Sequence, residues 1–199
     1  TPLMMGVGNV SELFDVDSIG LNALLLLLGF EAGVSLFLTV ENSVKTQGST
    51  RELVIASQMI SLAHHRGSPP KDLGVDLLVL KDKRRIETVF EESGAMVVDV
   101  KDYHIPYKPD PMGVFKIRVN HRDRVIEALY IGVNGKILIR GKDSGSIINY
   151  ILDKRLVSSI QHIAYLGREL AKAEEALRIN KNYVQEEPLF YTKEFLKIK

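Results

Sequence analysis

The 199-residue sequence contains no cysteine, which excludes disulfide bonds and thiolate metal sites. It also lacks an excess of either charge, because 26 Lys and Arg residues stand against 25 Asp and Glu residues. The sequence contains no basic block long enough to indicate a nucleic-acid partner. The longest apolar run, Ala23–Phe30, is far shorter than the roughly 20 residues that a membrane crossing needs. Together with the absence of a recognisable signal sequence, these features predict a cytoplasmic protein without a membrane or nucleic-acid partner.

Two consecutive strand-loop-helix patterns open the chain. The apolar segments Leu3–Val7 and Val34–Val40 each run into a polar loop, as buried strands do. Helical spacing and stop signals predict helices over Ile19–Phe30 and Ser49–His65. Near-continuous apolar strands of this kind are typical of parallel strands covered on both faces. We interpret residues 1–80 as the last strand-helix units of a TIM-barrel-like parallel sheet.

The second part of the chain has a different pattern. After a strand predicted at Val75–Leu80 and a short helix at Arg84–Glu92, alternating apolar and polar residues begin at Val114. The predicted α/β chain therefore continues, over residues 81–199, as a small α+β domain with an antiparallel three-stranded meander and two helices. Its predicted elements are strands at 115–119, 125–131 and 137–139, a type I′ turn at Asn134-Gly135, and helices at 144–155 and 159–179.

Polar side chains follow both early strands, where the ligands of parallel α/β structures gather. Asn9 carries a donor and an acceptor, which suits a fused heterocycle with ring nitrogens and a carbonyl. Lys45 precedes a predicted helix start and suits a phosphate or a carboxylate. The plainer alternative is that these loops only cap helices, because Ser49 and Glu52 stand in capping-box register. The candidate ligand-binding residues in this part are Asn9, Ser11, Asp17, Asn22, Lys45 and Ser49.

The last predicted helix carries a second polar cluster. His162, Tyr165 and Glu169 lie three and four residues apart on one helix face, with Arg168 nearby. Such a cluster can hold a ligand or a subunit, so His162 and Arg168 are further candidate ligand-binding residues. The alternative is a solvated or inter-domain face. A structural zinc site is not expected, because no second nitrogen ligand stands in suitable spacing.

Several segments carry a resemblance to a known group of proteins. Gly6–Leu13 followed by Asp17–Asn22 resembles the Gly-x-Ser-Asn-x-Ser loop and following helix of the pterin-binding barrels. These barrels include the dihydropteroate synthases and the methyltetrahydrofolate-dependent methyltransferases. Lys45–Leu53 and Arg66–Gly74 are similar to segments of the archaeal dihydropteroate synthase-related proteins, and this resemblance spans nearly the whole chain.

The second part is similar to the domain of unknown function that follows the barrel in those proteins. Asp110–Phe115, His162–Glu174 and Tyr183–Glu186 carry this similarity. The resemblance implies that the chain is the C-terminal portion of a longer protein that binds a reduced pterin in folate or methanopterin biosynthesis. It also implies that Asn9 contacts the pterin ring, that Lys45 and Asp17 complete the rim, and that His162 and Arg168 approach by closure or dimerisation.

The chain also departs from ordinary dihydropteroate synthases. It has Gly8-Asn9-Val10 where they have Ser-Arg-Lys, and it has no Arg-x-His pair after Val40. The ordinary condensation reaction is therefore not implied, and this portion alone is expected to be inactive even if the full-length protein is a transferase. Two alternatives remain open: a noncatalytic module that holds a pterin or a methyl carrier, and a structural domain that dimerises or contacts the missing N-terminal part.

Overall fold

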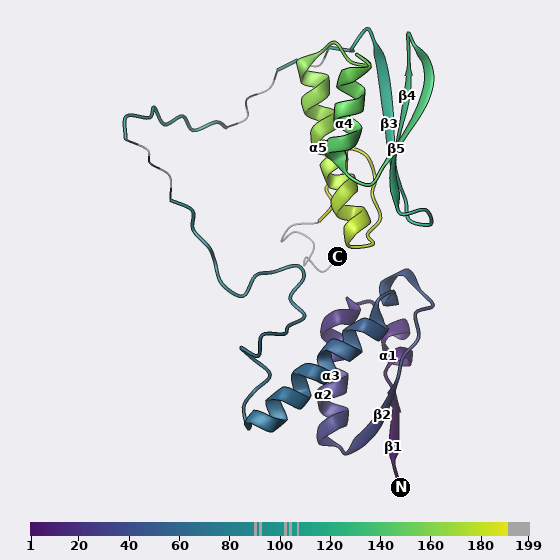
Figure 1. Ribbon diagram of the computed structural model, residues 1–199, viewed down its shortest axis with the longest axis vertical. Helices are drawn as coiled ribbons and strands as arrows, with labels where there is room; N and C mark the ends of the chain where they lie inside the picture. Colours follow the sequence, from purple (N-terminus) through teal and green to yellow (C-terminus); the bar gives the residue numbers. More distant parts are fainter. Residues whose placement is uncertain (90, 92, 102, 104, 107, 191–199) are drawn as a thin grey trace, which may run out of the picture. The chain divides into compact units, whose positions relative to one another are not determined.

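The computed structural model describes residues 1–89, 91, 93–101, 103, 105–106 and 108–190 (Figure 1). The chain has a mixed α/β architecture with two compact units, one over Thr1–Met96 and one from Val97 onwards. Within the described ranges, no helix combines the length and the apolar character that a membrane span requires.

The N-terminal unit is built on a small parallel sheet. Strands β1 and β2 pair in parallel, as predicted, and helices α2 and α3 lie side by side in this unit (Figure 1). Both helices contribute to one hydrophobic core, which includes Val7, Leu26 and Ile60. The elements in chain order are β1 (Leu3–Gly6), α1 (Gly8–Leu13), α2 (Ser18–Glu31), β2 (Val34–Leu38), η1 (Val44–Thr46) and α3 (Ser49–Arg66).

The turn between β1 and α1 passes close to the end of β2. A Cβ atom at Gly8 would lie 2.8 Å from the Val40 backbone nitrogen, so only glycine fits here without a shift of the backbone. The Val7 N–H donates to the Leu38 carbonyl over 2.9 Å, which extends the contact between the two chain segments. This close approach places the residues that follow both strands at one edge of the sheet.

Three local predictions for the first hundred residues were wrong. Residues 8–13 form helix α1 rather than a loop. Val75–Leu80 is not a strand, since it has no neighbouring strand with which to form a hydrogen-bonded ladder in the described part of the unit. Residues 84–89 are not helical, and 90 and 92 lie outside the described residues. A helix of that length gains too little from its own hydrogen bonds to form without a packing surface.

The C-terminal unit contains an antiparallel meander, as predicted. Its strands are β3 (Gly113–Asn120), β4 (Val125–Gly132) and β5 (Gly135–Gly141), in the order β3-β4-β5. The β4–β5 hairpin differs from the prediction: Gly132 pairs with Gly135, and of the two residues in the predicted turn only Gly135 has a positive φ, of 85°. A type I′ turn needs two such residues, so that assignment was wrong.

Two helices cover one face of this sheet, α4 (Ser144–Asp153) and α5 (Ile160–Arg178) (Figure 1). Both begin at a side-chain cap: Asp143 accepts from the Ser146 N–H over 2.7 Å, and Ser159 accepts from the His162 N–H. Inward-facing residues of the strands and helices form one core, which includes Ile117, Ile126, Tyr130, Ile147, Ile151, Leu166 and Leu170. This core holds the first turns of α5 against the edge strand β3.

Candidate functional site

Glu12 joins the two loops that follow the parallel strands of the N-terminal unit. Its Oε1 accepts hydrogen bonds from the Asn42 N–H (3.2 Å), the Ser43 N–H (3.0 Å) and the Thr46 hydroxyl (2.7 Å). These bonds, with that of Thr46 the strongest, lower the pKa of Glu12 to about 2. The polar rim of this unit is therefore organised by a carboxylate that the sequence did not single out as a site residue.

Ser11 and Asn22 belong to a buried hydrogen-bond chain beneath this rim. The Ser11 hydroxyl donates to Asn22 Oδ1 over 2.8 Å, and Asn22 Nδ2 donates to Glu52 Oε2 over 2.8 Å. Ser18 also donates to Glu52, over 2.9 Å. Both Ser11 and Asn22 are fully buried, so their polar atoms form hydrogen bonds inside the unit in this structure.

The predicted capping box at the start of α3 was wrong. Glu52 turns toward Ser18 and Asn22 instead of back to its own helix, and burial raises its pKa although those two bonds partly offset the effect. Glu41 provides a hydrogen-bond acceptor at the start of α3, because its carboxylate accepts from the Thr50 N–H over 2.9 Å. The Ser49 hydroxyl is buried and has no hydrogen-bond partner in the described part of the chain.

The remaining rim candidates lie at the surface. Asn9 is exposed on α1, and Asp17 is exposed at the N-cap of α2 without a side-chain capping bond. Lys45 Nζ pairs with Asp15 over 2.9 Å and donates to the Phe14 carbonyl over 3.0 Å. Asn9 and Asp17 are therefore open to a ligand, whereas Lys45 would first have to leave its present partners.

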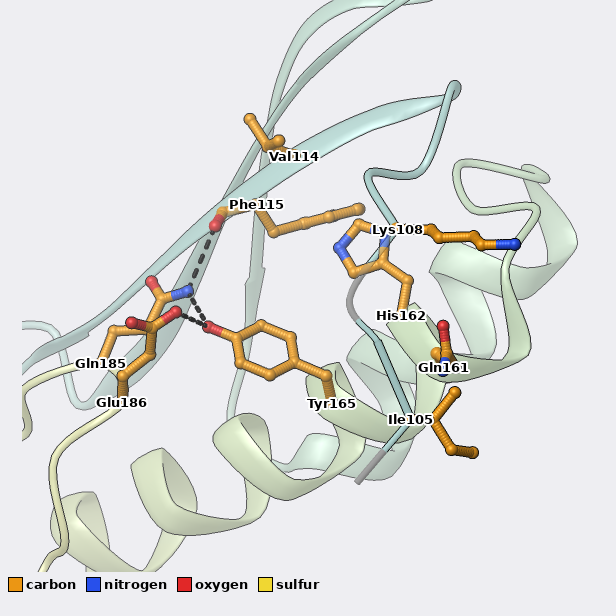
Figure 2. A pocket seen from close by; sticks show the side chains of 9 residues that line it. All are labelled: Ile105, Lys108, Val114, Phe115, Gln161, His162, Tyr165, Gln185 and Glu186. Atoms are coloured by element: carbon orange, nitrogen blue, oxygen red, sulfur yellow. Dashed lines mark hydrogen bonds between the residues drawn. The ribbon is translucent and has the colours of Figure 1, made fainter. Parts of the chain in front are cut away.

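The C-terminal unit contains a pocket of about 420 Å³ beside the edge strand β3 (Figure 2). Its walls come from β3, from the first turns of α5, from the segment before β3 and from the segment after α5. The lining residues are Ile105, Lys108, Val114, Phe115, Gln161, His162, Tyr165, Gln185 and Glu186.

A buried carboxylate orients the histidine of this pocket. The Asp110 side chain is fully buried and accepts from the Ser158 N–H (2.9 Å), the Ser159 N–H (3.0 Å) and the Met112 N–H (3.0 Å). It also accepts from the Ser158 hydroxyl over 2.7 Å. Burial works to raise the pKa of Asp110, but these hydrogen bonds outweigh it and hold the pKa well below the ordinary value.

Asp110 also lies 3.0 Å from His162 Nδ1. Because the carboxylate is ionised and can only accept, Nδ1 must carry the proton of the neutral ring. In that neutral form the other ring nitrogen, Nε2, is a hydrogen-bond acceptor. The ring is also fixed by an edge-on contact with Phe115, with 5.7 Å between the ring centroids.

Residues Tyr183–Glu187, which we term the C-terminal strap, contribute Gln185 and Glu186 to the opposite wall. The Gln185 side-chain amide bonds to the backbone of β3 as a neighbouring strand would. Its Oε1 accepts from the Ile117 N–H over 2.8 Å, and its Nε2 donates to the Phe115 carbonyl over 3.3 Å. The same Nε2 donates to the Tyr165 hydroxyl over 2.7 Å. The strap thus satisfies part of the open edge of β3.

Glu169 anchors the strap to α5. This buried carboxylate accepts from the Tyr183 hydroxyl (2.8 Å) and the Glu186 N–H (2.9 Å), and Lys172 Nζ lies 2.7 Å away. Burial raises the pKa of Glu169, but Lys172 and the two hydrogen bonds produce a net lowering. Burial and the neighbouring Glu169 carboxylate raise the pKa of Tyr183, so its hydroxyl stays a donor.

The structure thus places His162 in the pocket but not Arg168. The Arg168 side chain is 71% exposed, and its Cζ lies over the Tyr165 ring, 5.9 Å from the centroid. Sequence reasoning did not assign a site role to Asp110, Gln185 or Glu186. Asp110 lies 52 residues before His162, and no periodic pattern links residues at that separation. Their presence in the segments that carry the family resemblance was the one available signal.

One family model matches the second unit, and one relative matches nearly the whole chain. Residues 109–186 match the family described as PterinBD-DUF4346. The chain is 42% identical over 199 residues to the uncharacterized protein MJ0107 of Methanocaldococcus jannaschii, covering 95% of this chain and 36% of that protein. The chain thus spans about a third of the length of this relative. No solved structure matches.

A shorter relative, the uncharacterized protein ycf91 of Porphyra purpurea, is 33% identical over 85 residues, which cover 39% of this chain and 70% of that protein. The matched range includes the Asp110–His162 pair and residues 183–186 of the strap, and the name of the family refers to a pterin-binding-related domain. The chain belongs to the same family as ycf91, and its C-terminal unit carries the region described as PterinBD-DUF4346.

Proposed function

We propose that this chain is the C-terminal portion of a dihydropteroate synthase-like protein and that the protein binds a reduced pterin of the folate or methanopterin type. The N-terminal unit would supply the last strand-helix units of the pterin-binding barrel. Transferase activity would belong to the full-length protein, with this portion inactive alone. The family description of residues 109–186 and the length of the Methanocaldococcus relative support this proposal.

The observation that carries it is the position of Asn9. This side chain is exposed at the edge where the parallel strands β1 and β2 both end, and Glu12 holds the second loop against the first there. Ligands of parallel α/β structures bind at that edge. A carboxamide can donate to a ring nitrogen and accept from a ring N–H, which matches the edge of a pterin.

Replacing Asn9 with alanine is expected to weaken the binding of a reduced pterin by about tenfold, the value of roughly one good hydrogen-bond pair. Because Asn9 is exposed, the free energy of unfolding should change little. Isothermal titration calorimetry of the full-length protein with a dihydropterin measures this effect. Asn149→Ala, which removes an exposed amide from α4, is the matched control. No heat of binding with the unaltered protein would refute the proposal.

A further inference from the structure

We propose that the open face of the C-terminal sheet is a docking surface for a helix of another protein, one with apolar residues along one side and acidic residues beside them. This is the face of the β3-β4-β5 sheet that points away from α4 and α5 (Figure 1). The proposal does not depend on the proposed pterin function. The surface, which we term the basic sheet face, consists of Val114, Lys116, Leu129, Ile131, Lys136 and Leu138.

The alternation of side chains along the strands separates this face from the core. Phe115 and Ile117 of β3 belong to the core beneath the helices. Val114 and Lys116 alternate with them, so they point to the opposite side of the sheet, where both are exposed. Leu138 of β5 is exposed on the same side. In the described part of this unit, no helix covers these side chains.

The strand register brings the apolar residues of this face into one stripe. Val114 of β3 is paired with Ile131 of β4, and Leu129 of β4 is paired with Leu138 of β5. Ile131 and Leu129 lie two residues apart on β4, so they are neighbours on the same face. Val114 is 48% exposed and Leu138 is 51% exposed. The stripe therefore crosses all three strands and is open to a partner at both ends.

One lysine stands on each side of the stripe. Lys116 is paired with Leu129, and Lys136 is paired with Ile131. Both lysines are exposed, and neither has an ion-pair partner among the residues that the structure describes. Their charges are therefore available to acidic side chains that flank an apolar stripe on a partner.

The acidic residues of the sheet do not cancel this charge. Residues 113–142 contain seven Lys and Arg residues, and their acidic residues are Asp123 and Glu127. Glu127 is 4% exposed and accepts from Arg118 Nε over 2.6 Å, and Asp123 pairs with Arg140. The chain as a whole has a net charge of only +1, so the sheet concentrates positive charge. An acidic partner complements it.

The chemistry of the face favours a protein helix over other occupants. The face presents side chains, and an amphipathic helix can lay an apolar stripe on them with acidic residues on both sides. Single-stranded nucleic acid stacks on aromatic side chains, but Phe115 and Tyr130 of this sheet face the core. A second copy of the chain would bring Lys116 and Lys136 against the same two lysines, which repel each other.

A pair of synthetic helical peptides tests this surface. One carries leucine along one side and glutamate at the flanking positions, and its twin has glutamine in place of each glutamate. Nitrogen-15 NMR of the 199-residue chain locates the binding, and fluorescence anisotropy measures the dissociation constant. We expect the backbone amides of β3, β4 and β5 to shift, and the glutamate peptide to bind about fivefold more tightly, as for two exposed ion pairs. Added salt should reduce this difference.

Two variants of the face should weaken the binding of the glutamate peptide. Lys136→Glu should weaken it about fivefold, because an attraction becomes a repulsion. Leu138→Asn should weaken it by a similar factor, because an apolar contact is lost. Lys154→Glu is the matched control: this exposed lysine follows α4 outside the sheet, and the charge changes equally. Its dissociation constant should equal that of the unaltered chain, and circular dichroism verifies the fold of each variant.

The outcomes decide between the partner helix and the other occupants. Weaker binding in Lys136→Glu and Leu138→Asn, with none in Lys154→Glu, supports the surface. Equal binding of the two peptides, amide shifts confined to other elements, or no binding overturns it.

Tighter binding of polyuridylate or of phosphatidylserine vesicles than of the glutamate peptide also overturns it. A dimer in sedimentation that Leu138→Asn dissociates would assign the face to a second copy. A peptide that binds this chain but not the full-length protein would assign it to a segment of the same protein. None of these outcomes affects the test of Asn9, so the proposed function stands or fails separately.

Discussion

Asp110→Ala is expected to lower the free energy of unfolding of the C-terminal unit by about 3 to 5 kcal/mol, the usual cost of removing one partner from a buried charged network. The substitution leaves the part-buried N–H groups of Met112, Ser158 and Ser159 without their acceptor. It also frees the His162 ring. Urea unfolding followed by circular dichroism measures the loss.

The matched control is Asp153→Ala, because this aspartate is exposed and pairs only with its neighbour Lys154 among the described residues. It should leave the midpoint unchanged. A loss in Asp110→Ala no larger than that in the control would contradict the structural role of Asp110.

The same carboxylate predicts an acid dependence of stability. The pKa of Asp110 in the folded protein lies well below its ordinary value of 3.8, so the unfolded chain binds the proton at a higher pH than the folded chain does. The stabilisation is complete above the ordinary pKa and is lost as the pH falls below it. Asp110→Asn should remove part of this acid dependence.

Glu169→Ala is expected to destabilise the C-terminal unit by about 3 kcal/mol and to release the strap. Tyr183, the Glu186 N–H and Lys172 would all lose a buried charged partner. The released strap should be cut by a protease at low concentration, whereas the strap of the unaltered protein resists. Mass spectrometry of the fragments after limited proteolysis reads out this difference.

Glu175→Ala is the control on the same helix, because Glu175 is half-exposed and pairs with Arg178. Its cleavage pattern should equal that of the unaltered protein. If the strap of Glu169→Ala remained protected, the strap would not depend on this anchor.

The elements that the sequence predicted best are those with a strong local pattern and a partner to pack on. Alternation over 115–119 corresponds to β3, the apolar stretch over 125–131 corresponds to β4, and helical spacing at 159–179 corresponds to α5. In β3 and α5 the apolar side of the pattern is the side that is buried. The parallel pairing of β1 with β2 was also predicted correctly, from two near-continuous apolar strands.

Predictions failed where a local signal competed with a distant partner. Ser49 and Glu52 have capping-box spacing, but Glu52 gains two hydrogen bonds from Ser18 and Asn22 on another helix. Val75–Leu80 has a strand composition, but a strand without a neighbour leaves its backbone groups unpaired.

The candidate site was predictable only in part for the same reason. His162 could be named because it belongs to a polar face at helical spacing. Asp110, which contacts His162, and Gln185, which contacts Tyr165, could not be named, because both meet α5 only in the folded chain. Ser11 and Asn22 were predicted as ligand-binding residues, and their burial in an internal hydrogen-bond chain could not be inferred from spacing.

The most direct test of the account is the protonation of the His162 ring, observed by nitrogen-15 NMR of the full chain at neutral pH. We expect the neutral ring to carry its proton on Nδ1, where Asp110 accepts it. A neutral ring that carries its proton on Nε2 would contradict this arrangement.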